Sequence, residues 1–144
     1  MEFRIGGKRD LHLLAELNRQ LIEDEGHANP MSVAELEKRM RGWLVRTYTA
    51  VLFVEEAGVV GYALYRSDGA GIFLRQFFIC RHERRKGRGR AAMQLLLGRI
   101  WPPGTTVTLE ALCSNQAAIA FWRSLEFGDY ALTLRRHTPD RDGL

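Results

Sequence analysis

The chain has 144 residues, of which 46% are hydrophobic and 26% are charged, and its formal net charge is +4. These values are typical of a soluble globular protein and predict a single domain, residues 1–144, around one core. A membrane-spanning helix needs about 20 apolar residues, and no apolar run comes close to that length. The polar start of the chain lacks the pattern of a secretory signal. We therefore expect a cytoplasmic protein with no membrane partner.

The two cysteines, Cys80 and Cys113, are too few for a disulfide framework and lack the spacing of metal ligands. We expect both to be buried free thiols. The sequence therefore predicts no metal site.

Turn residues and hydrophobic periodicity divide the first half of the chain into short elements. The expected order is a strand at 3–5, a helix at 11–25, a helix after Ser32, and strands at 48–54, 59–65 and 72–80. Asp10 can cap the first helix, and Ser32 with Glu35 can form a capping box for the second. Short links between the three strands predict an antiparallel meander. Alternation along the last strand points Arg75 and Gln76 to opposite faces.

The pattern changes after residue 80. The expected elements are a helix at 89–101, a strand at 107–112, a helix capped by Ser114 or Asn115, and a final strand at 127–134. A strand, helix, strand order favours a right-handed crossover. The strands at 72–80 and 107–112 are therefore expected to be parallel neighbours.

A basic, glycine-rich turn between the strand at 72–80 and the next helix is the most informative segment. It consists of Arg84, Arg85, Lys86, Gly87, Arg88, Gly89 and Arg90. Glycines let successive backbone N–H groups face one concavity, and a helix N-terminus adds partial positive charge. Arginine binds phosphate oxygens with two parallel hydrogen bonds. The turn therefore predicts a ligand that carries phosphate.

Two motifs then suggest a family. The first, Gln/Arg-x-x-Gly-x-Gly/Ala, is matched by Arg84, Gly87 and Gly89. The second is an asparagine, an alanine, an aromatic pair and a final Gly-Phe, matched by Asn115, Ala118, Phe121, Trp122 and Phe127, with Glu126 in place of the glycine. With the order of elements, they make nearly the whole chain resemble the GCN5-related N-acetyltransferase (GNAT) family, which binds acetyl-CoA. The resemblance implies an α/β (α+β) fold: a mixed, mostly antiparallel sheet of six or seven strands with one splayed parallel pair, flanked by four helices.

The resemblance also implies a reaction and a cofactor site. The reaction is direct transfer of the acetyl group of acetyl-CoA, as co-substrate, to a primary amine. The backbone of Phe77, Phe78 and Ile79 would bind pantetheine, the turn 84–90 would bind the pyrophosphate, and Asn115 would bind pantetheine or the departing group. Family members often dimerise, so a homodimer is an open expectation.

Glu110 is the candidate general base, because it follows Leu109 on the strand that lines the other side of the splayed gap. The alternative is a solvated residue on an outward face. The family's usual proton donor is a tyrosine, but Trp122 stands there, and an indole N–H can only donate a hydrogen bond. Tyr130 or water would then protonate the thiolate. The same departure leaves open a non-catalytic acetyl-CoA sensor.

The acceptor site of such folds lies between the first two helices, their loop and the central strands. The loop is acidic, which favours a small cationic amine. The candidate substrate residues are Glu23, Glu25, His27 and Gln76. The alternatives are a solvated helix end and, for the acceptor, a protein N-terminus or lysine.

Two other ligand classes fit less well. The spacing Gly87-x-Gly89-x-x-Ala92 fits a loose dinucleotide fingerprint, but charged residues separate it from the strand. A nucleic-acid partner is not expected, because the basic charge is confined to one turn and no aromatic platform accompanies it.

Overall fold

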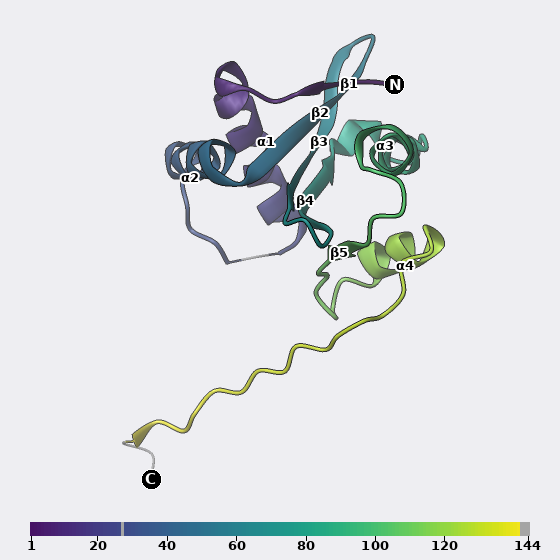
Figure 1. Cartoon of the computed structure of the whole chain (residues 1–144). Helices are drawn as coiled ribbons and strands as arrows, with labels where there is room; N and C mark the ends of the chain where they lie inside the picture. The colour runs from purple at the N-terminus through teal and green to yellow at the C-terminus, as the bar shows by residue number, and fades with distance from the viewer. Residues whose placement is uncertain (27, 142–144) are drawn as a thin grey trace. The chain divides into compact units, whose positions relative to one another are not determined.

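The computed structural model describes residues 1–26 and 28–141 (Figure 1). It divides the chain into two compact units, Met1–Leu112 and Cys113–Leu144, and each is described by itself. Within the described residues, no helix has both the length and the apolar character needed to cross a membrane.

The first unit is built on one mixed sheet. Its strands are β1 (Glu2–Ile5), β2 (Tyr48–Glu55), β3 (Gly58–Ser67), β4 (Ile72–Ile79) and β5 (Val107–Leu109). They lie in the order β1-β2-β3-β4-β5, and the first four are antiparallel to their neighbours while β4 and β5 are parallel. The predicted meander and the predicted parallel pair are both confirmed.

Helices cover both faces of this sheet (Figure 1). The first face carries α1 (Leu11–Asp24), which follows a 3-10 turn at Lys8–Asp10, and α2 (Val33–Arg46). The other face carries α3 (Arg88–Leu95), which continues as one π-helical turn at Leu96–Ile100. A 3-10 turn at Arg81–Glu83 joins β4 to the basic turn. The second unit contains α4 (Gln116–Ser124).

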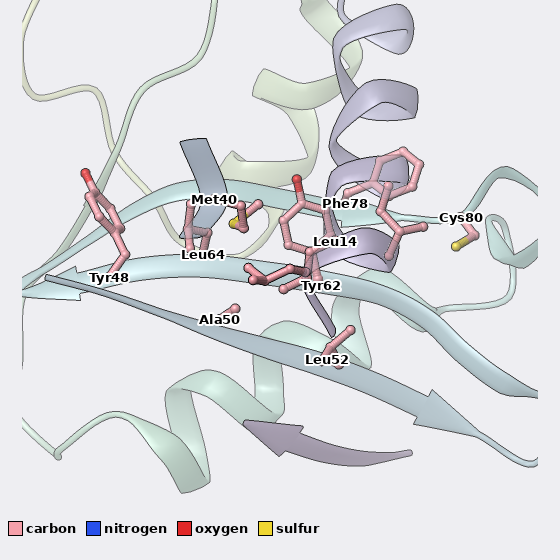
Figure 2. Close-up of a cluster of buried hydrophobic side chains, with 11 residues drawn as sticks. Leu14, Met40, Tyr48, Ala50, Leu52, Tyr62, Leu64, Phe78 and Cys80 are labelled. Carbon is pink, nitrogen blue, oxygen red and sulfur yellow. The ribbon is translucent and has the colours of Figure 1, made fainter. Parts of the chain in front are cut away.

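The main core lies between the sheet and the pair α1 and α2 (Figure 2). Leu14 and Met40 come from the two helices, and Leu64, Tyr62 and Phe78 come from the sheet. All five are at most 2% exposed. Burial of each such side chain contributes about 1.5–3 kcal/mol, so this face holds β3 and β4 firmly in place.

The residues that precede α1 and α2 use their side chains in different ways. The capping box is confirmed: the Glu35 N–H donates to Ser32 Oγ, and the Ser32 N–H donates to Glu35 Oε1. Asp10 occupies the expected N-cap position of α1, but its carboxylate accepts from the Gly7 N–H and from Arg4 instead of from the N–H groups of the helix. Burial alone raises the pKa of Asp10, but these two donors outweigh it and lower the pKa.

The expectation of six or seven strands is wrong for the described residues, where the sheet has five. Residues 127–134 form no strand, and β5 ends at Leu109 rather than at residue 112. Alternating apolar side chains suit a strand, but a strand also needs a neighbour for its backbone N–H and C=O groups. Residues 127–134 find no such neighbour within the described chain.

The free thiols are confirmed, but only one of them is buried. Cys80 is 6% exposed at the end of β4, whereas Cys113 is exposed. Burial raises the pKa of the Cys80 thiol. A protonated thiol is a weak nucleophile, which argues against a chemical role for Cys80.

Candidate active site

The candidate site is centred on an irregularity in β4. Leu64 of β3 lies opposite Gln76, but its neighbour Tyr65 lies opposite Leu74, so Arg75 is an extra residue in β4. The parallel pairing with β5 ends at the same place, with Leu74 opposite Leu109. β4 runs on to Ile79. The bulge therefore marks the point where the parallel pair separates.

The bulge also reverses which backbone groups face the β5 side. Before it, the Ile72 N–H donates to Thr106 O at 2.9 Å, toward β5. After it, the Cys80 N–H donates to Val60 O at 2.8 Å, toward β3. Strand alternation then directs the N–H and C=O groups of Phe77 and Ile79 toward the β5 side, and those of Phe78 toward β3. Of the three predicted pantetheine-binding residues, two present their backbone to the separated edge.

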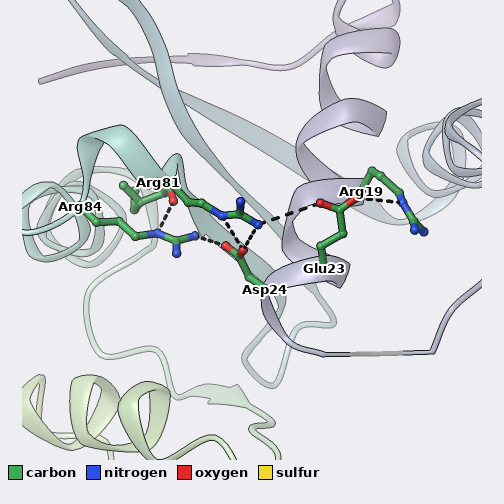
Figure 3. Close-up of polar contacts among 6 residues, drawn as sticks. Arg19, Glu23, Asp24, Arg81 and Arg84 are labelled. Carbon is green, nitrogen blue, oxygen red and sulfur yellow. Dashed lines mark hydrogen bonds and ion pairs between the residues drawn. The ribbon is translucent and has the colours of Figure 1, made fainter.

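Arg84 connects the end of this strand to the end of α1 (Figure 3). Its Nε donates to Ile79 O at 2.8 Å, and its Nη2 donates to Asp24 Oδ2. Arg81 Nε donates to the other oxygen, Asp24 Oδ1, at 2.8 Å. Burial by itself raises the pKa of Asp24, but the hydrogen bonds from Arg84 and Arg81 outweigh it and hold the pKa below its ordinary value of 3.8.

The basic turn ends in the N-terminus of α3. Gly87 is the residue before the helix and lies in the left-handed region, with φ +75°, as does Arg85 with φ 63°. Left-handed residues are typical of turns whose amides converge on an anion. Because Gly87 has no side chain, it cannot cap the N–H groups of the first helical turn. A diphosphate fits this N-terminus for that reason.

Two further residues of the turn, Arg88 and Lys86, already have carboxylate partners. Arg88 contacts two carboxylates, Glu55 at 3.1 Å and Glu83 at 3.3 Å, and Lys86 lies 3.7 Å from Glu83. The hydrogen bond from Arg88 is the main reason why the pKa of Glu83 is lowered. Glu83 was missed although its partners Lys86 and Arg88 lie only three and five residues later, whereas Asp24 and its partner Arg84 are 60 residues apart.

The predicted acid–base and leaving-group residues are divided between the two compact units. Glu110 is exposed and directly follows β5 in the first unit. Asn115 caps α4 by accepting from the Ala118 N–H at 3.1 Å, and Tyr130 is 93% exposed; both belong to the second unit. Trp122 packs against the rings of Phe121 and Phe127. The roles of Glu110, Asn115 and Tyr130 stay predictions.

Two of the predicted substrate residues, Glu23 and Gln76, lie in different surroundings. Glu23 lies 3.4 Å from Arg19 and 4.0 Å from Arg81, so its charge is partly compensated (Figure 3). His27 lies outside the described residues. Gln76 accepts a hydrogen bond from the Tyr62 hydroxyl at 2.7 Å, on the face covered by α1 and α2.

A comparison with protein families decides the classification, because the acetyltransferase (GNAT) family matches residues 14–127. The chain belongs to the GNAT family. The predicted resemblance is thereby confirmed over most of the sequence. A search of curated proteins finds no match.

Solved structures support the GNAT fold. The protein smu.2055 of Streptococcus mutans superposes with a TM-score of 0.77 at 23% identity, covering 91% of this chain and 85% of the other. An aminoglycoside 6'-N-acetyltransferase of Acinetobacter haemolyticus gives 0.73 at 15%, covering 97% and 99%. A predicted acetyltransferase of Clostridium acetobutylicum, solved with acetyl-CoA, gives 0.72 at 14%, covering 94% and 95%. At these identities the likeness shows the fold alone.

Proposed function

We propose that this GNAT protein transfers the acetyl group of acetyl-CoA directly to the primary amine of a small cationic acceptor, in the cytoplasm and as a monomer or homodimer. The observation that carries the proposal is the pairing of two features along one connection. β4 continues past its last pair with β5, and the next helix, α3, begins at a glycine in the left-handed region. The edge of β4 beyond its last pair with β5 suits pantetheine, which is an extended arm that bears amides. The N-terminus of α3 suits a diphosphate.

The chain's own groups would then act as follows. The N-terminus of α3 and the basic turn hold the diphosphate, and the edge of β4 at Phe77 and Ile79 holds the pantetheine arm. A backbone N–H at this edge stabilises the negative charge that develops on the thioester oxygen. The amine nitrogen forms a bond to the carbonyl carbon as the C–S bond breaks. Glu110, directly or through water, takes the amine proton, and Tyr130 or water protonates the thiolate.

Two neighbours of the same fold support a cationic acceptor. One is an aminoglycoside acetyltransferase, and another was solved with the aminoglycoside sisomicin. In this chain, Asp24 and Glu23 of the acidic loop contact arginines. A protein amine and a purely sensory role are the competing proposals, and the second follows from Trp122.

Calorimetry with acetyl-CoA and a thiol-release assay test the proposal together. We expect acetyl-CoA to bind, and Gly87→Trp to abolish binding by blocking backbone approach at the helix start. Gly42→Trp, at an exposed glycine of α2 whose added Cβ would meet no atom within 4 Å, is the matched control and should bind normally. Free thiol should appear only when an amine is present. Binding without thiol release on any amine would favour the sensor, and absence of binding would refute the proposal.

A further inference from the structure

A cluster of arginines and aromatic rings lies beside the bulge of β4; we call Arg39, Arg66, Arg75, Trp43 and Tyr48 the arginine–aromatic cluster. Arg39 and Arg75 both stack on Trp43, with guanidinium carbons 4.5 and 4.7 Å from the ring centroid. Arg66 and Arg75 both donate to the Tyr48 hydroxyl, at 2.7 and 3.4 Å. Three positive charges therefore converge on two rings.

This cluster has donors in excess of acceptors. Within the described part of the chain, none of its three arginines forms an ion pair with a carboxylate. Arg39 donates to Asn18 Oδ1 at 3.2 Å, yet Arg39 Nε and Asn18 Nδ2 are buried and have no hydrogen-bond partner among the described residues. Burial lowers the pKa of Arg39, and repulsion from Arg75 lowers it further. An anion bound at the exposed Arg75 would relieve the repulsion between Arg75 and Arg39.

The bulge places this cluster beside the point where β4 and β5 separate. Sequence alternation placed Arg75 and Gln76 on opposite faces, and the structure shows that this is wrong. Arg75 contacts Trp43 and Tyr48, and Gln76 contacts Tyr62, all on the face covered by α1 and α2. An extra residue in one strand interrupts the alternation, so two successive side chains share a face. Arg75 is exposed and directly follows Leu74, the last residue of β4 paired with β5.

A negative charge lies near the same face. Glu25 follows the end of α1, and its charge and that of Arg39 both act on the buried hydroxyl of Tyr62. Burial raises the pKa of Tyr62 well above its ordinary value, Glu25 adds to the rise and Arg39 opposes it. Within this face, Gln76 Oε1 is held by the Tyr62 hydroxyl at 2.7 Å and lies one residue from Arg75, so a polar acceptor atom accompanies the arginines.

We propose that the acceptor carries a carboxylate beside its amine, as an amino acid does, and that Arg75, supported by Arg39, binds this carboxylate while the amine faces Gln76. The proposal rests on the proposed acetyl transfer, and it narrows the acceptor of the same site to one that carries a carboxylate as well as its cationic ammonium group. Arginine is suited to the task because its planar fork matches a carboxylate with two hydrogen bonds.

Matched pairs of acceptors test this inference on the wild-type protein. Each pair is an amino acid and the amine left when its carboxylate is removed, such as leucine with 3-methylbutylamine and lysine with 1,5-diaminopentane. Thiol release is measured with acetyl-CoA fixed, and kcat/KM is referred to the concentration of unprotonated amine. We expect kcat/KM to be at least about tenfold higher for the carboxylate-bearing member, which is the loss typical of one charge-assisted hydrogen bond.

Two variants then locate the preference. Arg75→Gln should bring the ratio within each pair close to one, whereas Arg41→Gln, at an exposed arginine of the same helix as Arg39, should keep the wild-type ratio. Melting temperatures verify that both variants fold. Equal turnover of both members by the wild type, or an unchanged ratio in Arg75→Gln, overturns the inference and leaves acetyl transfer intact. Absence of thiol release with every amine instead overturns the proposed function itself.

Discussion

Gly61 is the residue on which the placement of β4 depends most closely. It lies opposite Ile79 in the β3–β4 pair, and a Cβ at this position would meet Phe78 O at 2.2 Å and Ile79 Cα at 3.1 Å. Both contacts are with backbone, which cannot move as the end of a side chain can. Glycine is therefore required here by close approach of two strands, at the end of β4 that faces the candidate cofactor site.

We predict that Gly61→Ala lowers the free energy of unfolding by about 2–3 kcal/mol, because β3 and β4 must move apart to admit the methyl group. Gly42→Ala is the control, because Gly42 is an exposed residue in the middle of α2 and its added methyl group would meet no atom within 4 Å. That change should stabilise the protein by about 0.5–1 kcal/mol through helix propensity. Urea unfolding of both variants gives the two values, and similar effects at the two positions would contradict the argument.

At the scale of elements, Asp24 joins the end of α1 to the segment after β4. Arg81 and Arg84 approach its carboxylate from the same short segment, and Arg84 also holds the last carbonyl of β4 at Ile79. The position of the Arg84 side chain thus depends on a residue at the end of α1.

We predict that Asp24→Asn destabilises the protein by about 1 kcal/mol at pH 7, a value discounted for the solvent screening of its exposed arginine partners. The pKa of Asp24 is lower in the folded protein than its ordinary value of 3.8. Its stabilising effect is therefore complete above pH 3.8 and is lost as the pH falls through the folded pKa. The difference between wild type and variant should shrink in that acidic range.

Denaturant unfolding at several pH values measures this difference, and Glu56→Gln provides the control. Glu56 is exposed between β2 and β3, so its substitution removes one negative charge without breaking an ion pair of the described residues. It should change stability by less than about 0.5 kcal/mol. A difference between Asp24→Asn and wild type that grows toward low pH would show that the assigned direction of the pKa shift is wrong.

At the scale of the whole molecule, the two compact units raise the question of cooperativity. The family match runs from residue 14 to residue 127 and so spans the boundary at Leu112 and Cys113. The motif residues Gly87 and Asn115 also lie on opposite sides of this boundary. We accordingly keep the prediction that the chain folds as one domain.

The three tryptophans provide the test, because Trp43 and Trp101 lie in the first unit and Trp122 lies in the second. In protein labelled with 5-fluorotryptophan, one cooperative domain should give the same thermal midpoint for all three fluorine signals. Acetyl-CoA at about 100 times its dissociation constant should raise the stability seen at every signal by about 2.7 kcal/mol. A separate midpoint for Trp122 would instead show two independently folding units.

Much of the fold could be predicted, and the failures have common physical causes. Ser32 and Glu35 predicted a capping box correctly because both partners lie within one turn of a helix. The strand at residues 127–134 failed because its side-chain alternation says nothing about whether a neighbouring strand is available. Likewise, Arg84 was recognised by its motif, but its partner Asp24 lies 60 residues earlier and has no local signal.

By itself, the sequence determined the GNAT family, the meander, the parallel pair and the glycine-containing basic turn before α3, since each depends on residue spacing and backbone propensity over short distances. Only the tertiary structure decided that Arg75 and Gln76 share a face, that Asp24 holds Arg84, and that three arginines gather without a carboxylate partner in the described chain. Those outcomes depend on strand register and on contacts between distant segments. The free energy of these long-range contacts decides them, and the local sequence around each residue does not predict it.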